Sequence, residues 1–133
     1  MVALSLIVSL SILIPKAKAD APIYPKPQTP TELIIKYAEQ YNTSSKVLLS
    51  VAKCESGLNQ NAINYNDGGK GKHSVGIFQF QKSTFDRWSN DETNPRALGE
   101  ELDYYSVNDQ AKLASYMFSK GQGNQWTCYR NLY

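Results

Sequence analysis

One glutamate of the sequence stands where a carboxyl group could donate a proton. Glu55 lies three, four and seven residues after Ala52, Val51 and Leu48. These spacings put its side chain on the apolar face of a helix, in the last turn. Burial and the C-terminal end of the helix dipole both disfavour a charged carboxylate, so we expect the pKa of Glu55 to be raised. A carboxyl group that stays protonated near neutral pH can act as a general acid.

Two other interpretations of Glu55 fit the same pattern. An exposed Glu can end a helix without any catalytic role, and a partly exposed one can form a salt bridge. The rest of the chain must decide between these interpretations.

Residues 1–19 have the composition of a secretory signal peptide. Residues 2–14 are apolar or Ser, and the sequence AKA at 17–19 gives a small-x-small cleavage pattern. The apolar run is shorter than the roughly 20 residues that span a bilayer, and Pro15 ends it. One feature departs from the signal-peptide pattern, since no Lys or Arg precedes the run. An uncleaved membrane anchor is the alternative. We expect cleavage before Asp20, and therefore a secreted, periplasmic or cell-wall-associated protein without stable membrane insertion.

The charge balance of the chain argues against a nucleic-acid partner. The 133 residues include 14 Lys and Arg and 12 Asp and Glu. Loss of Lys16 and Lys18 with the signal peptide would leave 12 residues of each sign. No basic tract stands out, so we expect no binding to DNA or RNA.

The chain has two cysteines, Cys54 and Cys128. In an exported protein such a pair favours a disulfide, and two buried free thiols are the alternative. The only histidine, His73, is far from both in the sequence, and this spacing does not fit a zinc motif. We predict no metal site and no cofactor.

The residues around Glu55 predict two short helices after a proline-rich tether at 20–29. Thr29 and Glu32 can form a capping box around Pro30, which predicts a helix over residues 30–42. A second helix is expected from Thr43 or Ser44 to residue 56, where Gly57 can end it.

The second half of the domain predicts a small β element followed by helices. The stretch SVGIFQF at 74–80 has strand propensity and follows a glycine-rich loop. Helices are expected over 83–89 and 109–120. Within these segments Ile77 and Phe85 are expected in the core. The sum is one domain over residues 30–133, an α+β fold that is mainly helical.

Three ordered motifs resemble the lysozyme-like superfamily, in particular the lytic transglycosylases and the resuscitation-promoting factors. A helix ends in Glu55-Ser56, a Ser-x-Gly-hydrophobic-hydrophobic-Gln segment follows at 74–79, and Gly-x-Gly-x-x-Trp-x-Cys closes the domain at 121–128. The resemblance covers roughly residues 33–129. It implies a lysozyme-like fold with a small β-hairpin after the catalytic helix.

The resemblance also implies roles for single residues. Glu55 would be the general acid and base that cleaves the bond between N-acetylmuramic acid and N-acetylglucosamine in peptidoglycan glycan strands. Cys54 and Cys128 would form the disulfide that resuscitation-promoting factors have beside their catalytic Glu. We expect a monomeric enzyme.

Four residues are predicted to bind the substrate. Ser74, Gly76 and Gln79 would line the floor of the cleft, where a glycine lets a sugar approach the backbone closely. Gly76 also fits an ordinary turn. Lytic transglycosylases often have an Ala-Tyr-Asn-Ala-Gly stretch whose Tyr contacts the catalytic Glu. The nearest match is Tyr116, and Tyr104 and Tyr105 are its rivals. Trp126 fits either a sugar platform or, preferably, a packing residue.

The sequence does not contain a second acid at a recognisable spacing. A hydrolytic lysozyme would usually need one. Asp67 is the best candidate, although a solvated loop acid is the preferred interpretation of this residue. One carboxyl group suffices if the 2-acetamido group of the substrate assists and the muramyl 6-hydroxyl attacks, which gives a 1,6-anhydro product. We predict this route; the alternatives are a hydrolytic lysozyme and a non-catalytic wall-binding module on the same fold.

Overall fold

The computed structural model describes residues 26–69 and 72–133. The predicted signal peptide at 1–19 and most of the predicted tether at 20–29 lie outside the described residues, and residues 26–29 have no regular secondary structure. No helix in the described part of the chain is both long and apolar enough to cross a membrane.

The first two helices form as the capping residues predict. Helix α1 (Pro30–Gln40) begins with the Thr29–Glu32 capping box, and α2 (Ser45–Ser56) begins at Ser44, whose side chain accepts from the Val47 amide. Gly57 ends α2 with a φ of 66°, in the left-handed region that favours glycine. Both predicted helices are therefore confirmed, and α1 is two residues shorter than expected.

A three-stranded antiparallel sheet follows α2. Its strands β1 (Ile63–Asn64), β2 (Ser74–Val75) and β3 (Phe80–Gln81) are adjacent in chain order. The segment 74–80 is thus not one strand. It forms two strands joined by a turn in which the Gln79 amide donates to the Gly76 carbonyl at 3.2 Å. Strand β1 is exposed and only two residues long, so its sequence has no period from which it could be predicted.

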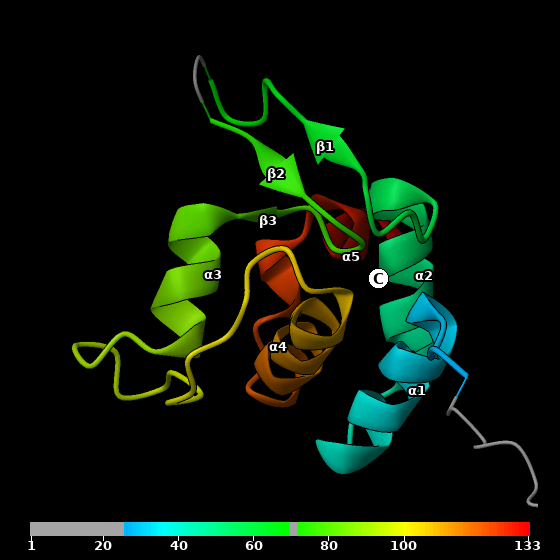
Figure 1. The fold of residues 1–133 in the computed structure, drawn as a ribbon, viewed down its shortest axis with the longest axis horizontal. Helices are drawn as coiled ribbons and strands as arrows, with labels where there is room; N and C mark the ends of the chain where they lie inside the picture. The colour runs from blue at the N-terminus through cyan, green and yellow to red at the C-terminus, as the bar shows by residue number, and fades with distance from the viewer. Residues whose placement is uncertain (1–25, 70–71) are drawn as a thin grey trace, which may run out of the picture.

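The remaining elements complete a mainly helical domain. Helices α3 (Lys82–Ser89) and α4 (Val107–Ser119) lie where the sequence predicts them, within two residues. A 3₁₀ turn, η1 (Gly123–Gln125), and a short helix, α5 (Thr127–Leu132), were not predicted. Figure 1 shows the sheet at one end of the molecule, between α2 and α3, with α5 behind it. The predicted lysozyme-like α+β class is confirmed.

An aromatic cluster holds the sheet on the helices. Its buried rings pack edge to face with centroids 5.4–6.4 Å apart, and they belong to Phe78, Phe80, Phe85, Tyr104 and Trp126. The Tyr104 hydroxyl donates to the Phe80 carbonyl at 2.7 Å, and the Trp126 indole N–H donates to the Phe78 carbonyl at 2.8 Å. These two bonds tie backbone carbonyls of the hairpin and β3 to Tyr104 and Trp126, so they fix the position of the hairpin.

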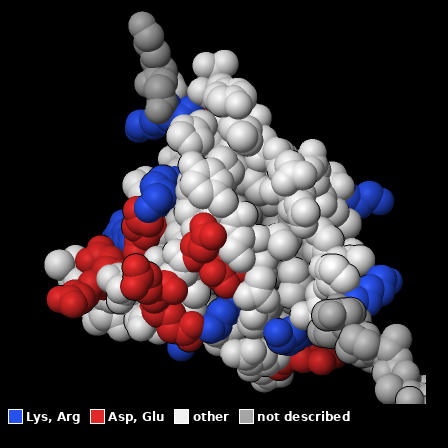
Figure 2. Space-filling model, in the orientation of Figure 1, with Lys and Arg blue, Asp and Glu red and all other residues white. Residues whose placement is uncertain are grey.

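The surface charge is unevenly distributed. Figure 2 shows Asp and Glu gathered on the side of the visible face that α3 and the following loop occupy, whereas Lys and Arg are scattered. Among the described residues on this face, Lys and Arg form no continuous basic surface for an anionic strand.

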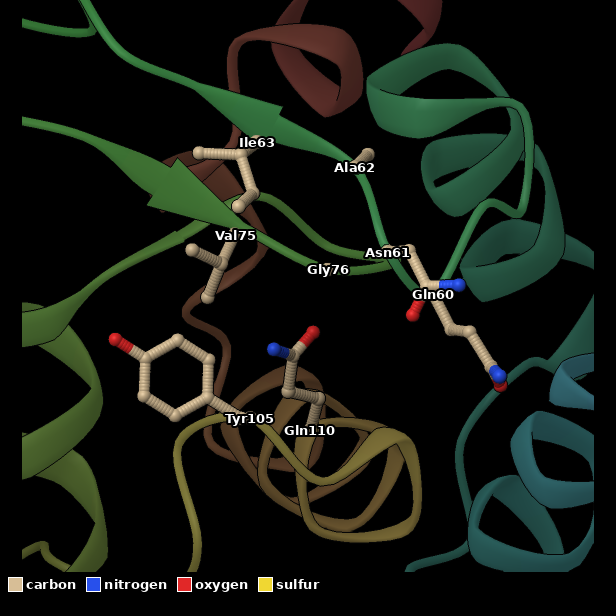
Figure 3. Close-up of a pocket in the computed structure, with 8 residues that line it drawn as sticks. All are labelled: Gln60, Asn61, Ala62, Ile63, Val75, Gly76, Tyr105 and Gln110. Atoms are coloured by element: carbon tan, nitrogen blue, oxygen red, sulfur yellow. The ribbon is translucent and has the colours of Figure 1, made fainter.

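Gly76 occupies a position where any side chain would collide with α4. A Cβ atom there would lie 2.1 Å from Gln110 Oε1. Figure 3 shows the Gln110 amide beneath Gly76, at the wall of a cavity of about 190 Å³. Gln110 is 1% exposed and donates to the Tyr104 carbonyl at 2.8 Å, so its amide cannot swing away without losing that bond.

We expect Gly76→Ala to lower the free energy of unfolding by about 2–4 kcal/mol, because the clash adds to the strain of a φ of 76°. Gly99→Ala is the matched control: Gly99 has the same φ of 76°, but nothing lies within 4 Å of its added Cβ. Urea unfolding of both variants separates clash from backbone strain. Equal losses of stability in the two variants would show that the Gln110 side chain moves away from the added Cβ at little cost in free energy.

Candidate active site

Glu55 lies in the last turn of α2 with its carboxylate against the start of α5. The side chain is half-buried, as the periodicity of α2 predicts. Its Oε1 accepts a hydrogen bond from the Cys128 amide at 3.2 Å. The N-cap residue of α5 is Trp126, which offers no side-chain acceptor to the free amides of the first turn. The carboxylate of Glu55 therefore takes the place of a capping side chain.

The surroundings of Glu55 favour its protonated form. Burial is the main effect that raises the pKa of Glu55, and the negative charge of Asp67 raises it further. The Cys128 amide and Arg130 act in the opposite direction, and the net pKa is above that of an ordinary Glu. The carboxyl group can thus keep its proton to a higher pH than an exposed glutamate, as a general acid requires.

Two links hold the end of α2 in place beside this carboxylate. The Cys54–Cys128 disulfide joins α2 to α5, with Cα atoms 6.0 Å apart. The Ser56 hydroxyl donates to the Ile77 carbonyl at 2.9 Å and ties the helix end to the hairpin. The residues on both sides of Glu55 are therefore anchored, one to α5 and one to the hairpin. The sequence assigned no role to Ser56.

Asp67 is bound to the sheet rather than solvated in its loop. Its Oδ2 accepts from the Ser74 hydroxyl and, at 3.4 Å, from the Gln81 side-chain amide. The Asp67 side chain is half-buried, and the preferred interpretation as a solvated loop acid was wrong. Long-range contacts to β2 and β3 fix this residue, and nothing in the local sequence indicates them.

A polar cavity extends from Asp67 towards α5. It has a volume of about 280 Å³. Its lining combines polar side chains with two buried aromatic rings, from Asp67, Gln81, Thr84, Gln125, Phe80 and Trp126. The amide and hydroxyl groups of this lining suit the hydroxyl and acetamido groups of a sugar. Trp126 is 5% exposed and stacks on Phe118, so the preferred packing interpretation of Trp126 holds.

The three residues predicted for the cleft floor build the hairpin. Ser74 is fully buried and holds Asp67. Gly76 is a turn glycine under which Gln110 packs. The Gln79 side-chain amide donates to the carbonyls of Gly76 at 2.9 Å and Ala62 at 3.2 Å. Contact of these residues with a substrate stays a prediction.

Among the described residues, none of the three candidate tyrosines forms a hydrogen bond to Glu55. The Tyr116 hydroxyl donates to the Arg96 carbonyl at 2.8 Å, because its face of α4 is turned towards that loop. Tyr104 is bonded to Phe80, and Tyr105 is 69% exposed. Within the described part of the chain, the hydrogen bond to the Glu55 carboxylate comes from the backbone of Cys128. A backbone donor leaves no sequence signature, so this partner could not be predicted.

Sequence comparison assigns the chain to a known protein family. The chain belongs to the transglycosylase SLT domain family, whose sequence model matches residues 32–128. The matched range contains α2, the sheet and Cys128. No curated protein sequence matches the chain. Membership of the family supports cleavage of peptidoglycan by a lytic-transglycosylase-like domain, and a place of action at the cell wall.

Proposed function

We propose that the protein is an exported lytic transglycosylase with Glu55 as its general acid and base. The bond cleaved is the β-1,4 linkage from N-acetylmuramic acid to N-acetylglucosamine. The observation that carries this proposal is the half-buried Glu55 carboxyl group in the last turn of α2, which the Cys128 amide holds and whose pKa is raised by burial. Family membership gives the substrate class, and this geometry supports the choice of Glu55.

The proposed reaction uses one carboxyl group twice. Glu55 gives its proton to the glycosidic oxygen as the bond from this oxygen to C1 of the muramyl residue breaks. The 2-acetamido group assists at C1, and the muramyl 6-hydroxyl then attacks C1 and returns a proton to Glu55. Because the Cys128 amide holds Oε1, we assign the proton transfers to Oε2. The product is a 1,6-anhydro sugar, and the protein ends in its starting state.

The cavity beside Asp67 supports binding of a glycan rather than a strongly charged ligand. Gln81, Thr84 and Gln125 offer amide and hydroxyl groups for the acetamido and hydroxyl groups of the sugars. Sugar recognition through these groups needs no basic surface.

Two features support export. Residues 1–19 have the pattern of a signal peptide, and the Cys54–Cys128 disulfide persists in oxidising compartments such as the periplasm or the cell exterior.

Analysis of the digestion products tests the proposed function. Purified peptidoglycan is digested with the protein, and the soluble products are analysed by mass spectrometry. The Glu55→Gln variant is the negative control. We expect fragments that end in 1,6-anhydromuramic acid and that are missing from the Glu55→Gln digest. New reducing ends would instead identify a hydrolytic lysozyme. A folded protein that releases no Glu55-dependent fragments from several walls would contradict the enzyme and favour a binding module.

A further inference from the structure

A second cavity lies on the face of the sheet opposite Asp67. Successive side chains of a strand point to opposite faces, so Ser74 binds Asp67 on one face and Val75 lines this cavity on the other. Ile63, the partner of Val75 in the β1–β2 register, lines it too. The cavity shares no lining residue with the one beside Asp67, and Glu55 does not line it either. It is therefore separate from the candidate active site (Figure 3).

Gln110 in the wall of this cavity carries an acceptor that has no donor. Its amide nitrogen donates to the Tyr104 carbonyl at 2.8 Å, which fixes the position of the oxygen. Gln110 is 1% exposed, and no hydrogen bond to its Oε1 comes from the described part of the chain. Figure 3 shows the Gln110 amide directed from α4 into the cavity, towards Gly76. A molecule that donates to this oxygen would offset the free-energy cost of a buried, unpaired acceptor.

The lining of the cavity is neutral and contains further amides. Gln60 and Asn61 supply two side-chain amides, and no lining residue carries a charge. Two lining residues are open to solvent, since Tyr105 is 69% exposed and Ile63 is 46% exposed. The ring of Tyr105 offers apolar contact area, and the amides offer both donors and acceptors. An uncharged ligand with an apolar face and an amide group fits this combination.

The volume of the cavity limits which part of a ligand can enter it. About 190 Å³ is less than the roughly 300 Å³ at which pockets for whole ligands begin. One pendant group can fill the cavity while the rest of the ligand lies outside, on the exposed ring of Tyr105. An acetamido group has the right chemistry, because its N–H can donate to Gln110 Oε1 and its methyl group can contact Val75.

We propose that this cavity is an accessory site for a glycan strand, which takes the acetamido group of an N-acetylglucosamine residue. The choice of a glycan rests on the proposed function. The acetamido N–H donates to Gln110 Oε1, and the sugar ring lies on Tyr105. The neutral lining favours N-acetylglucosamine over N-acetylmuramic acid, whose lactyl group carries a stem peptide with charged carboxylates. Since Glu55 is not part of this site, the site holds a strand without cleaving it.

A single water molecule is the other occupant that fits the cavity. It would donate to Gln110 Oε1 and bond to a second polar group of the lining. The two occupants differ in their dependence on Tyr105. A water molecule gains nothing from an exposed ring, whereas a sugar loses much of its contact area when the ring is removed.

The test is an NMR titration of the ¹⁵N-labelled Glu55→Gln variant with the β-1,4 tetramer of N-acetylglucosamine. The Glu55→Gln background prevents cleavage of the sugar during the titration. We expect the backbone amide signals of Asn61, Ala62 and Gly76 to shift as the site fills. The β-1,4 tetramer of glucose, which has no acetamido group, should leave these three signals unchanged.

Variants of Tyr105 in the same background test the role of the ring. Tyr105→Ala should weaken binding at this site by about tenfold, and Tyr105→Phe, which keeps the ring, should bind as well as Tyr105 does. Tyr133→Ala is the matched control: Tyr133 is 64% exposed and follows α5, which lies behind the sheet in Figure 1. This variant should leave the shifts of Asn61 and Gly76 unchanged.

The outcomes separate this inference from the proposed function. Signals of Asn61 and Gly76 that do not respond to the sugar would mean that the cavity holds only water, and the inference would be overturned. Shifts that persist in Tyr105→Ala would overturn it as well. If the wild-type protein cleaves peptidoglycan and either of these results is found, the accessory site fails alone. If the sugar binds here and no Glu55-dependent cleavage occurs, the proposed function fails and the site supports a wall-binding module.

Discussion

Replacement of Glu55 by Gln is expected to lower the rate of glycan cleavage by about 10³-fold without unfolding the protein. The amide has no acidic proton that it could transfer to a leaving oxygen. Its Oε1 can still accept from the Cys128 amide, as the carboxylate does at 3.2 Å. The geometry of the site is therefore kept while the proton donor is lost. The measurement is the initial rate of product release, with thermal melting of both proteins in parallel.

The pH dependence of the wild-type rate also reports on the protonation of Glu55. Glu55 must be protonated at the first step, so activity should fall as the pH rises through its pKa. Burial and the charge of Asp67 raise this pKa, so the fall should occur at higher pH than for an ordinary Glu. Glu92→Gln, at an exposed position after α3, is a control that should keep both rate and profile. Glu55→Gln with most of the wild-type rate would exclude Glu55 as the acid.

The helix that carries Glu55 could be predicted because its signals are local. Ser44 caps α2, Gly57 ends it, and buried Leu48 and Val51 define its apolar face. These residues set the side on which Glu55 lies, and burial on that side raises its pKa. Each step involves residues within four positions of the next, where periodicity and capping are informative.

The partners of Glu55 could not be predicted in the same way. The Cys128 amide lies 73 positions away and belongs to a backbone, so no residue type identifies it. Helix α5 has six residues and no side-chain cap at Trp126. It is therefore too short to show a helical period, and it lacks the capping residue that predicts the start of a helix. Asp67 is fixed by a register between β2 and β3, strands too short to show a period.

The case of Tyr116 shows the limit of matching a motif without its surroundings. The residue lies in α4 near the position that the resemblance suggested, yet its ring packs on Tyr41 and its hydroxyl reaches Arg96. One residue along a helix turns a side chain by about 100°, so an approximate match does not fix the direction in which the side chain points. Phe118, two residues later, is the α4 side chain that stacks on Trp126.

Replacement of both cysteines by Ser is expected to destabilise the domain by about 4 kcal/mol and to lower its melting temperature by about 15 °C. The disulfide joins residues 74 positions apart and so restricts a large part of the unfolded chain. Its loss therefore increases the entropy of the unfolded state more than the loss of a short loop would. Differential scanning calorimetry of the wild-type protein and the double variant measures the difference.

The same change should reduce activity at temperatures where the variant is still folded. The disulfide holds α5 against the end of α2, and the Cys128 amide that binds Glu55 belongs to one of its two residues. With the bond absent, α5 is held by packing and by the hydrogen bond from Trp126 to the Phe78 carbonyl, and the Glu55 carboxyl group loses part of its fixed orientation. A reducing agent should have both effects on the wild-type protein and neither on the double variant. Equal melting temperatures of oxidised and reduced wild-type protein would mean that the two thiols are not paired in solution, and that packing around Trp126 and Phe118 is enough to hold α5 beside Glu55.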